Sequence, residues 1–560
     1  MSRSNGITVT HSLLKQPKPK GVRGFFSRYI SPILRRSPLF RWRLQKSTPL
    51  RLRRIPPNPG LGDARLGALL LDGHFVLCGE RLELSEESWM PKGASKNWLR
   101  TLHGFEWLAD IEASSDPDAG QAARHIVGSW IKSHRQWSEL PWNTLVCANR
   151  ILSWLTHFDL VNKGATASFT ERFTHEVADQ INYLVSNYAN IKLYGQGRIR
   201  LLKALLYGSL CLPDGNTLAQ NCLEELAGQL VILLRADGGT QHRSVSAQIQ
   251  ILEDLIDIRD FLRVERLQRP QFLKDAIAKM QPLAMTFIMP DGHLAHVSGG
   301  MDASPERLER LFDNKPVEPL EFSAATGYNR IQARRAVLFV DAGVQAPTQY
   351  DKEAHASTLS FEFFYGTQKI IGNIGCHKQI GIWGQVQRAT AAHSTLVLDN
   401  RNSSEIRSDG SIGRQPSKVF CRPSRSRDAR HLDMSHDGYT ALGGYVHYRR
   451  LHLDQSGQRL RGEDRLSGPT SAEAVLRFHL HPLVQVETLS TDDRVMLYPH
   501  RGRPWQFSVT NTNITIEDSV YMQDSESYAS NQLVVPMPAR GEGREHKNTD
   551  QIVLWDMKQI

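Results

Sequence analysis

The sequence predicts a helical domain followed by an antiparallel β-sandwich. Apolar residues recur at helical spacing from about residue 98 to 289, and short β-rich runs separated by Gly, Asp and Asn follow Pro290. At 560 residues the chain is too long for one hydrophobic core. We therefore predict a basic tail over residues 1–62, a helical domain over 63–290, a linker over 291–330 and a β domain over 331–560.

The helical prediction depends on regular apolar stripes. One stripe holds Val245, Ile249, Leu252 and Ile256, and Ser244 precedes it as a helix N-cap. Similar segments lie near residues 121–133, 144–159, 171–187, 198–211, 217–235 and 270–287. Their short connections favour antiparallel neighbours, which is typical of either an incomplete α/α toroid or a helical bundle.

Several short runs predict the strands of the β domain. One pair reads as a hairpin, Tyr445 to Leu453 and Arg459 to Leu466, around a turn at Gln455-Ser456-Gly457. The other runs are Ala336–Val340, Leu359–Phe364, Ser394–Leu398, Val475–Leu480 and Trp505–Val509. Many short strands in a row indicate a sandwich of antiparallel sheets.

The net charge of +10 belongs to the N-terminal tail. Residues 1–62 carry fourteen Lys and Arg and no acidic residue, which leaves 54 basic and 58 acidic residues in the rest of the chain. Such a block is typical of a solvated arm, and it also suits contact with anionic lipid or another polyanion. We do not expect nucleic-acid binding, because no known nucleic-acid module accompanies the charge.

Neither an export signal nor a membrane-spanning segment is evident. Leu13 and Leu14 are followed at once by Lys15 and Pro17, so the apolar core of a signal peptide is missing. No apolar run approaches the roughly 18–20 residues that span a bilayer. The six cysteines are scattered without a C-x-x-C pair, which favours buried free thiols over disulfides or a thiolate zinc site.

Three segments of the β domain carry a resemblance to a known family. They are Ala354–Glu362 (AHASTLSFE), Gly372–Gly375 (GNIG) and Arg388–Thr395 (RATAAHST). Together they resemble the core signature of the heparinase II/III C-terminal domain. In that family a His, an Asp and a second His hold a metal, and the matching positions here are His355, Asn373 and His393.

The resemblance extends beyond this signature over roughly residues 90–530. In the β domain, His447–Arg450 and Gly462–Arg465 resemble the family's following hairpin. In the helical half, the similar segments are Trp107–Asp110, Arg150 with Trp154, Lys203–Leu205, Asp237–Gly239 and Leu252–Leu255. The family's fold is an α/α toroid followed by a β-sandwich, and the family works mostly in the bacterial cell envelope.

The implied cofactor is a zinc ion. Two imidazoles and an oxygen donor match the ligands that zinc prefers. Asn373 departs from the family, because an amide oxygen is a neutral and poorer donor than a carboxylate. The alternative is that His355 and His393 are buried histidines hydrogen-bonded to strand backbone.

The resemblance implies cleavage of an acidic polysaccharide by β-elimination next to a uronic acid. The site must neutralise the sugar carboxylate, a base must remove the C5 proton, and an acid must protonate the departing oxygen. The family assigns these steps to an Asn-His pair, a Tyr and a further His. Here Gln196 with Gly197, Ala247 and Glu353 stand at those positions.

If the protein is a lyase, other residues must therefore carry out these steps. We expect Gln196 to donate to a carboxylate, Glu353 or His242 to act as the base, and Tyr188 or Tyr194 to act as the acid. For each of these residues the alternative is an ordinary structural role, as a helix-start, turn or core residue. The expected substrate contacts come from Trp142, Arg243, Arg388 and His447. A tryptophan at helical spacing is also a common core residue.

Three functions remain open from the sequence. The first is a polysaccharide lyase, and the second is a non-catalytic binder of acidic polysaccharide that keeps the cleft without the chemistry. The third is a glycoside hydrolase, which needs two carboxylates across a cleft. Glu106, Asp110 and Asp237 are available for that role.

Overall fold

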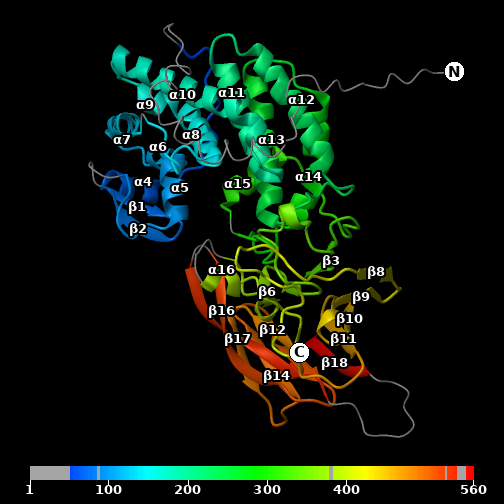
Figure 1. Cartoon of the computed structure of the whole chain (residues 1–560). Helices are drawn as coiled ribbons and strands as arrows, with labels where there is room; N and C mark the ends of the chain where they lie inside the picture. Colours follow the sequence, from blue (N-terminus) through cyan, green and yellow to red (C-terminus); the bar gives the residue numbers. More distant parts are fainter. Residues whose placement is uncertain are drawn as a thin grey trace, which may run out of the picture. The chain divides into compact units, whose positions relative to one another are not determined.

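The structure, a computed structural model, describes residues 51–84, 89–134, 136–301, 303–376, 382–523, 526–538 and 550–560. Most of the predicted basic tail (residues 1–50) lies outside this range. Helices fill the chain up to Thr286, and the long strands begin at Tyr328 (Figure 1). The chain divides into two compact units, described separately below. The helical unit runs to Val231 and includes Asp254–Pro270, whereas the sandwich unit comprises Ile232–Glu253 and Gln271–Ile560.

The predicted helices are present close to their expected positions. They are α4 (Ala64–Leu71), α5 (Lys96–Gly104), α6 (Leu108–Ala113), α7 (Ala119–Ser133), α8 (Thr144–Thr156), α9 (Phe158–Asn162), α10 (Ala167–Asn187), α11 (Gly195–Cys211), α12 (Asn216–Leu233), α13 (Val245–Val264) and α14 (Gln271–Thr286). Ser244 caps α13 as predicted, because its hydroxyl accepts the Ala247 N–H at 3.1 Å. The predicted stripe of α13 is buried. No described helix has the length and apolar character needed to span a bilayer.

Aromatic side chains fill the core of the helical unit. Trp98, Trp130 and Trp154 are fully buried, and Phe105 packs edge-on against Trp130 and Trp154. The Arg150 guanidinium lies 4.0 Å from the centre of the Trp130 ring and donates to the carbonyl oxygens of His103 and Pro141. This core fixes α5, α7 and α8 against one another, so it holds the first turn of α8 in place.

Two antiparallel sheets form the sandwich unit. In the described residues one sheet has the order β13-β14-β15-β18-β11-β10-β9-β8, and the other has the order β16-β17-β12-β6-β5-β4-β3 with β7 paired to β12. The strands of the first sheet are β8 (Val419–Arg425), β9 (Ala429–Tyr439), β10 (Tyr445–Asp454), β11 (Arg459–Ser467), β13 (Val484–Thr488), β14 (Arg494–Pro499), β15 (Trp505–Val509) and β18 (Asp550–Gln559). The strands of the second are β3 (Tyr328–Ala333), β4 (Ala336–Asp341), β5 (Phe361–Tyr365), β6 (Gln368–Gly372), β7 (Leu396–Leu398), β12 (Ala474–Leu480), β16 (Thr515–Gln523) and β17 (Glu526–Pro536).

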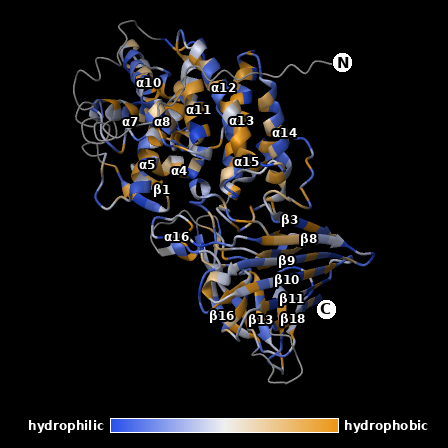
Figure 2. Ribbon diagram, turned by 45° about the vertical axis from the view of Figure 1, so that its right-hand side comes forward, coloured by the Kyte–Doolittle hydropathy of each residue, from blue (hydrophilic) through white to orange (hydrophobic). Residues whose placement is uncertain are grey.

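The hairpin predicted around Gln455-Ser456-Gly457 is confirmed. Strands β10 and β11 pair in antiparallel register from Val446 opposite Ser467 to Leu453 opposite Leu460. Buried and more exposed residues alternate along both strands, and Figure 2 shows the matching alternation of hydrophobic and hydrophilic residues. One face of this sheet therefore belongs to the core.

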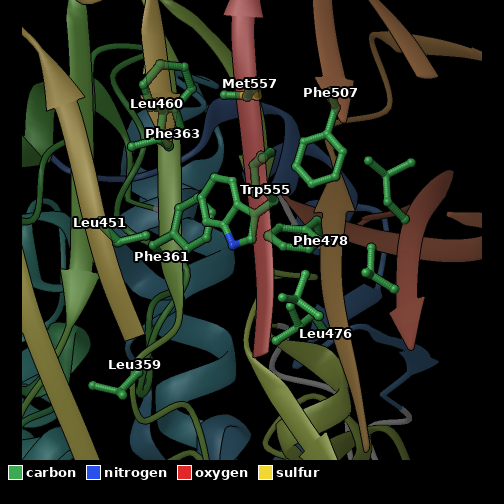
Figure 3. Close-up of a cluster of buried hydrophobic side chains, with 14 of the residues drawn as sticks. Leu359, Phe361, Phe363, Leu451, Leu460, Leu476, Phe478, Phe507, Trp555 and Met557 are labelled. Carbon is green, nitrogen blue, oxygen red and sulfur yellow. The ribbon is translucent and has the colours of Figure 1, made fainter. Parts of the chain in front are cut away.

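The core between the two sheets is apolar and aromatic. Trp555 of β18 stacks on Phe361 of β5 at 5.7 Å between ring centres and contacts Phe478 of β12 and Phe507 of β15 (Figure 3). These rings come from both sheets, so their burial holds the sandwich closed. Replacing one buried aromatic side chain of this size by alanine lowers the free energy of unfolding by on the order of 3–5 kcal/mol.

Short elements complete the fold. A small hairpin, β1 (His74–Leu77) with β2 (Glu80–Glu83), follows α4 and was not predicted. The segment predicted as a linker contains helix α15 (Pro305–Glu309), whose N-cap Ser304 accepts the Arg307 N–H. Helix α16 (Ile382–Val386) precedes the Arg388–Thr395 segment.

Candidate functional site

A pocket of about 590 Å³ lies in the helical unit beside the first turn of α8. The C-terminal half of α5, the start of α8, the end of α10 and the loop that leads into α11 form its wall. The lining residues are Arg100, Thr101, Glu106, Asn143, Thr144, Leu145, Val146, Asn149, Tyr183, Asn187, Asn190, Ile191, Lys192 and Leu193. Four of them are asparagines, and two are cations.

Helix capping and side-chain hydrogen bonds shape this pocket. The Asn143 side chain accepts the Leu145 N–H at 3.1 Å and so begins α8. The Tyr183 hydroxyl donates to the Trp142 carbonyl at 3.1 Å, which ties the end of α10 to the start of α8. Asn187 donates to the Tyr183 carbonyl one turn earlier on α10. The polar lining is therefore carried by helix ends that are held together.

Glu106 is fixed in the pocket wall by a network of charges. The Arg200 guanidinium donates to Glu106 at 2.9 Å, to Asn149 at 3.0 Å and to the buried Asp254 at 2.6 Å. The Asn149 amide also donates to Glu106 at 2.8 Å. Lys203 pairs with the same Asp254 at 2.8 Å. The charges of Arg200 and Lys203 are thus neutralised by protein carboxylates.

Arg100 and Lys192 differ from those paired cations. Both side chains are exposed at the pocket, and neither forms an ion pair within the described residues. The hydrogen bond of Arg100 is to the Asn97 amide oxygen at 3.1 Å. Two cations beside amide side chains can bind a carboxylate and the hydroxyls of a sugar.

Gln196, which stands at the family's Asn position, and the two tyrosines predicted as the acid lie close to this pocket in sequence. Gln196 is half-buried in the first turn of α11, three residues after Leu193 of the pocket wall. Tyr194 immediately precedes α11 and is 55% exposed. Tyr188 is buried, and the Arg198 guanidinium lies 4.0 Å from the centre of its ring. Burial raises the pKa of Tyr188, so its hydroxyl stays protonated.

Trp142 is a core residue in this structure. Its side chain is 4% exposed, its indole N–H donates to the His134 carbonyl, and its ring packs edge-on against Tyr183. Its contribution to the pocket is indirect, because its carbonyl oxygen accepts the Tyr183 hydroxyl. A stacking contact of this indole with a sugar stays a prediction.

In the sandwich unit, the Asp237-Gly238-Gly239 turn is closely packed. The Asp237 carboxylate accepts hydrogen bonds from the backbone of Ala325 and Thr326, from the Thr326 hydroxyl and from the Gly239 N–H. Gly238 has φ of +81°, and a Cβ there would lie 1.9 Å from the Lys279 carbonyl oxygen. Only glycine fits at this position.

Arg243 follows that turn and is buried in an ion pair. Its guanidinium donates to Asp341 of β4 at 2.5 Å and to the Thr326 carbonyl at 2.5 Å. The Tyr328 hydroxyl donates to the Arg243 carbonyl at 2.6 Å. Ser357 donates to the second oxygen of Asp341 at 2.7 Å. The predicted substrate-binding charge is therefore held by the protein itself.

His242 and Glu353, the two predicted bases, lie on neighbouring segments of the sandwich unit. The His242 ring packs edge-on against Tyr350 at 5.0 Å, and the Ser244 hydroxyl donates to the Glu353 carboxylate. Burial lowers the pKa of His242 to about 4, so the imidazole is neutral at pH 7. A neutral imidazole has the protonation state that a base requires.

The structure brings His355 and His393 together as the sequence predicted. Their Nδ1 and Nε2 atoms lie 3.1 Å apart, and both side chains are buried. Asn373 makes no hydrogen bond to either ring; its amide oxygen accepts the Ser394 N–H at 2.9 Å. In the described part of the chain, no group of three His, Cys, Asp or Glu side chains is placed to hold a metal. This donor set of two imidazoles and an occupied amide does not fit the expected zinc ion.

The other two predicted substrate contacts are also buried. Arg388 donates to the carbonyl oxygens of Ala354 at 2.7 Å and Gly410 at 2.9 Å. The His447 imidazole bonds the Asp464 carboxylate at 2.7 Å between the two sheets. Contact of either side chain with a substrate stays a prediction.

The carboxylates considered for hydrolysis have separate surroundings. Glu106 lines the pocket, whereas Asp237 belongs to the turn of the sandwich unit described above. Asp110 accepts the Asp63 N–H at 2.8 Å, and burial raises its pKa to about 6. A glycoside hydrolase needs two carboxylates that face each other across one pocket. These contacts do not support such a pair.

Sequence reasoning missed most of the pocket-lining residues. Arg100, Lys192 and the four asparagines carry no motif, and each looks like an ordinary surface residue. A usable signal was the position of Asn143 before an apolar helical stripe, which marks a capped helix end. Such ends expose polar groups that ligands can use.

Comparisons with known proteins identify the C-terminal half. Residues 315–553 match the family described as heparinase II/III-like, C-terminal. Over these residues the sandwich is similar to a heparinase II/III-like C-terminal domain. The resemblance stated from the His355 and His393 segments is therefore confirmed, and both segments lie inside the match.

Solved structures share the fold of the whole chain. A crystal structure of heparinase III is 13% identical with a TM-score of 0.71, covering 99% of this chain and 92% of that one. The heparan sulfate lyase HepC of Pedobacter heparinus, as a mutant, is 16% identical with a TM-score of 0.62, covering 93% and 87%. These likenesses confirm the fold class, a helical toroid followed by an antiparallel β-sandwich that includes the heparinase II/III-like domain.

A curated relative matches along almost the full length. It is the FtsZ-localized protein C of Caulobacter vibrioides, which is 26% identical over 522 residues, 87% of each chain. That name describes the location of the relative, whereas the names of the solved structures describe an enzymatic activity. The two kinds of relative therefore suggest different functions on one fold.

Proposed function

We propose that this protein binds an acidic, uronic-acid-containing polysaccharide in the pocket of the helical unit, without cleaving it. The observation that carries the proposal is the pair of exposed cations, Arg100 and Lys192, in a pocket lined by asparagines. A sugar carboxylate would accept hydrogen bonds from the two cations, and the amides would bond the ring hydroxyls.

The fold supports the class of ligand. Solved structures of this fold include a heparan sulfate lyase, which acts on an acidic polysaccharide. A pocket of about 590 Å³ has the usual size of a small-ligand site, so it suits one or two sugar units of a polymer. The fixed Glu106 carboxylate would accept hydroxyl hydrogens and would repel a second sugar carboxylate placed beside it.

The chain's own residues argue against β-elimination. Ala247 stands where the resemblance expects the tyrosine, and alanine has no hydroxyl to protonate a leaving oxygen. Arg243 is paired with Asp341, so its charge is not available to neutralise the substrate carboxylate beside the C5 proton.

A second candidate is a lyase with reassigned groups, and one observation favours it. His242 is neutral because burial lowers its pKa to about 4, and it lies beside the segment that holds Glu353. A neutral imidazole can accept a proton over the whole range above about pH 5. This candidate predicts activity that rises as pH passes about 4 and that is lost on replacement of His242.

The proposal is tested with a panel of heparin, hyaluronan, chondroitin, alginate and bacterial exopolysaccharides, with neutral dextran as the control. We expect the protein to retain at least one acidic polymer and no dextran, with no rise in absorbance at about 230–235 nm. That absorbance reports the double bond formed by β-elimination. An absorbance rise that is lost in His242→Ala and kept in His125→Ala would establish the lyase instead. Failure to retain any acidic polymer, together with no rise in absorbance, would refute both candidates.

We further propose that the protein localises with FtsZ. The support is the match along 87% of both chains with a protein named for its localisation with FtsZ. A fluorescent fusion in the cell of origin should coincide with FtsZ and should disperse when FtsZ is depleted. A uniform distribution in dividing cells would contradict this location.

A further inference from the structure

The two imidazoles at the expected metal position are satisfied by the protein itself. His393 donates its Nδ1–H to the Ala389 carbonyl at 2.7 Å, which leaves its Nε2 as an acceptor. His355 donates its Nδ1–H to that Nε2 at 3.1 Å. The remaining nitrogen, Nε2 of His355, accepts the Gly299 N–H at 3.4 Å. Each of the four ring nitrogens is thus either a donor or an acceptor of a hydrogen bond, and the four assignments are mutually consistent.

Asn373 has the opposite character, because half of its amide is unsatisfied. Its oxygen accepts the Ser394 N–H at 2.9 Å, while its Nδ2 is buried without a hydrogen-bond partner in the described residues. An unsatisfied buried polar atom costs on the order of 1–3 kcal/mol. Such an atom marks a position where a different side chain would be better satisfied.

We propose that His355 and His393 form a metal-independent hydrogen-bonded pair in this protein, and that Asn373 is the residue that excludes zinc. The Asn373 oxygen is a neutral donor that already accepts the Ser394 N–H, and an amide nitrogen cannot ligate a cation. A carboxylate at this position would keep the Ser394 hydrogen bond with one oxygen and would have a second, charged oxygen for a metal. One amide in place of one carboxylate therefore decides whether the two imidazoles bind zinc or each other.

The pair joins three segments of the sandwich unit. The Ser298 hydroxyl accepts the His355 N–H at 3.1 Å, and the next residue, Gly299, donates to the His355 ring. Gly299 also accepts a hydrogen bond from the hydroxyl of Ser246, in the first turn of α13. The segments near Gly299, His355 and His393 are thereby held together by hydrogen bonds, in a place where the family's metal would hold them.

Asn373→Asp tests the proposal directly. The backbone N–H of residue 373 donates to the buried Glu362 carboxylate at 3.4 Å, and Lys369 already pairs with that carboxylate at 3.6 Å. A second buried carboxylate at position 373 would lack a cation of its own, which is unfavourable unless a metal binds. We expect the variant to melt at a lower temperature than wild type in chelator and to regain stability in zinc. We also expect roughly 100-fold tighter zinc binding than wild type, since even an indirect metal contact is worth 10–100-fold. The melting temperature of wild type should be the same in chelator and in zinc.

The measurements are the zinc content of the full chain after zinc exposure and dialysis, and the melting temperature with zinc or with chelator. The controls are His393→Ala and the double variant Asn373→Asp with His393→Ala. The zinc content that is lost in these controls is the zinc that depends on His393. We expect His393-dependent zinc near one per chain in Asn373→Asp and near zero in wild type. Near-stoichiometric zinc in wild type that disappears in His393→Ala would overturn the proposal, even if Asn373→Asp fails to fold. A folded Asn373→Asp that gains no zinc would overturn it as well.

Discussion

Asp464→Ala should destabilise the sandwich unit by about 3–5 kcal/mol, because it leaves buried donors without their acceptor. The Asp464 carboxylate accepts hydrogen bonds from His447 at 2.7 Å, from Arg449 at 2.7 Å and 3.2 Å, and from the Trp555 indole at 2.9 Å. All four side chains are buried between the sheets. Removal of the carboxylate would strand the Arg449 charge in the core, with only the carbonyls of Leu359 and Ser394 as acceptors.

The free energy of unfolding is measured by urea titration with tryptophan fluorescence, to which Trp555 is one of eleven contributors. Asp433→Ala is the matched control, since Asp433 pairs with Arg422 and Arg450 on the exposed face of the same sheet. Its loss should cost less than about 1 kcal/mol. Equal effects of the two substitutions would show that Asp464 is not the centre of this network.

The Asp464 carboxylate also predicts how the free energy of unfolding changes at acid pH. Burial raises the pKa of Asp464, but the Arg449 and His447 side chains outweigh burial and hold the pKa at about 2, below its usual value of 3.8. A group with a lowered pKa in the folded state stabilises the protein above the unfolded value. Its contribution should therefore be complete above about pH 4 and should disappear as the pH falls towards 2. Asp464→Ala should lack this part of the acid transition.

Periodicity in the sequence was enough to predict the fold in outline. The α13 stripe and its Ser244 cap are local features, since all their information lies within one helix. The β10–β11 hairpin is equally local, because its turn residues and its alternating strands are adjacent in the chain. The hairpin of β1 and β2 was missed, since four-residue strands give too short a pattern to distinguish from a loop.

The roles of individual site residues were harder to predict, because they depend on distant partners. Arg243 looked available for a substrate, but Asp341 neutralises it from 98 positions away. Glu106 and Arg200 meet across 94 positions, so their network is not visible in either segment alone. The proximity of His355 and His393 was predictable through the family signature, whereas the hydrogen bond between the rings was not.

The second large effect is expected in the pocket. Replacing Arg100 and Lys192 together by Ala should weaken binding of an acidic oligosaccharide by about 100-fold, since each charged contact contributes roughly tenfold. Both side chains are exposed and lack ion pairs in the described residues, so the fold should be unaffected. Binding should also weaken as salt is raised, because exposed charges are screened.

The control is Arg65→Ala with Lys132→Ala, which removes the same charges from surface positions outside the pocket lining. The basic tail can also attract a polyanion, but it is identical in all these proteins. The ratio between variant and wild type therefore isolates the pocket. Short uronic-acid oligosaccharides are preferable to polymers, because they span less of the tail.

The most direct test of pocket recognition is thus the dissociation constant of a uronic-acid tetrasaccharide, measured by calorimetry on the full-length wild type, the pocket double variant and the surface control. The result predicted here is a constant raised about 100-fold in the pocket variant and nearly unchanged in the control. Equal constants for all three proteins would contradict recognition of the sugar by Arg100 and Lys192.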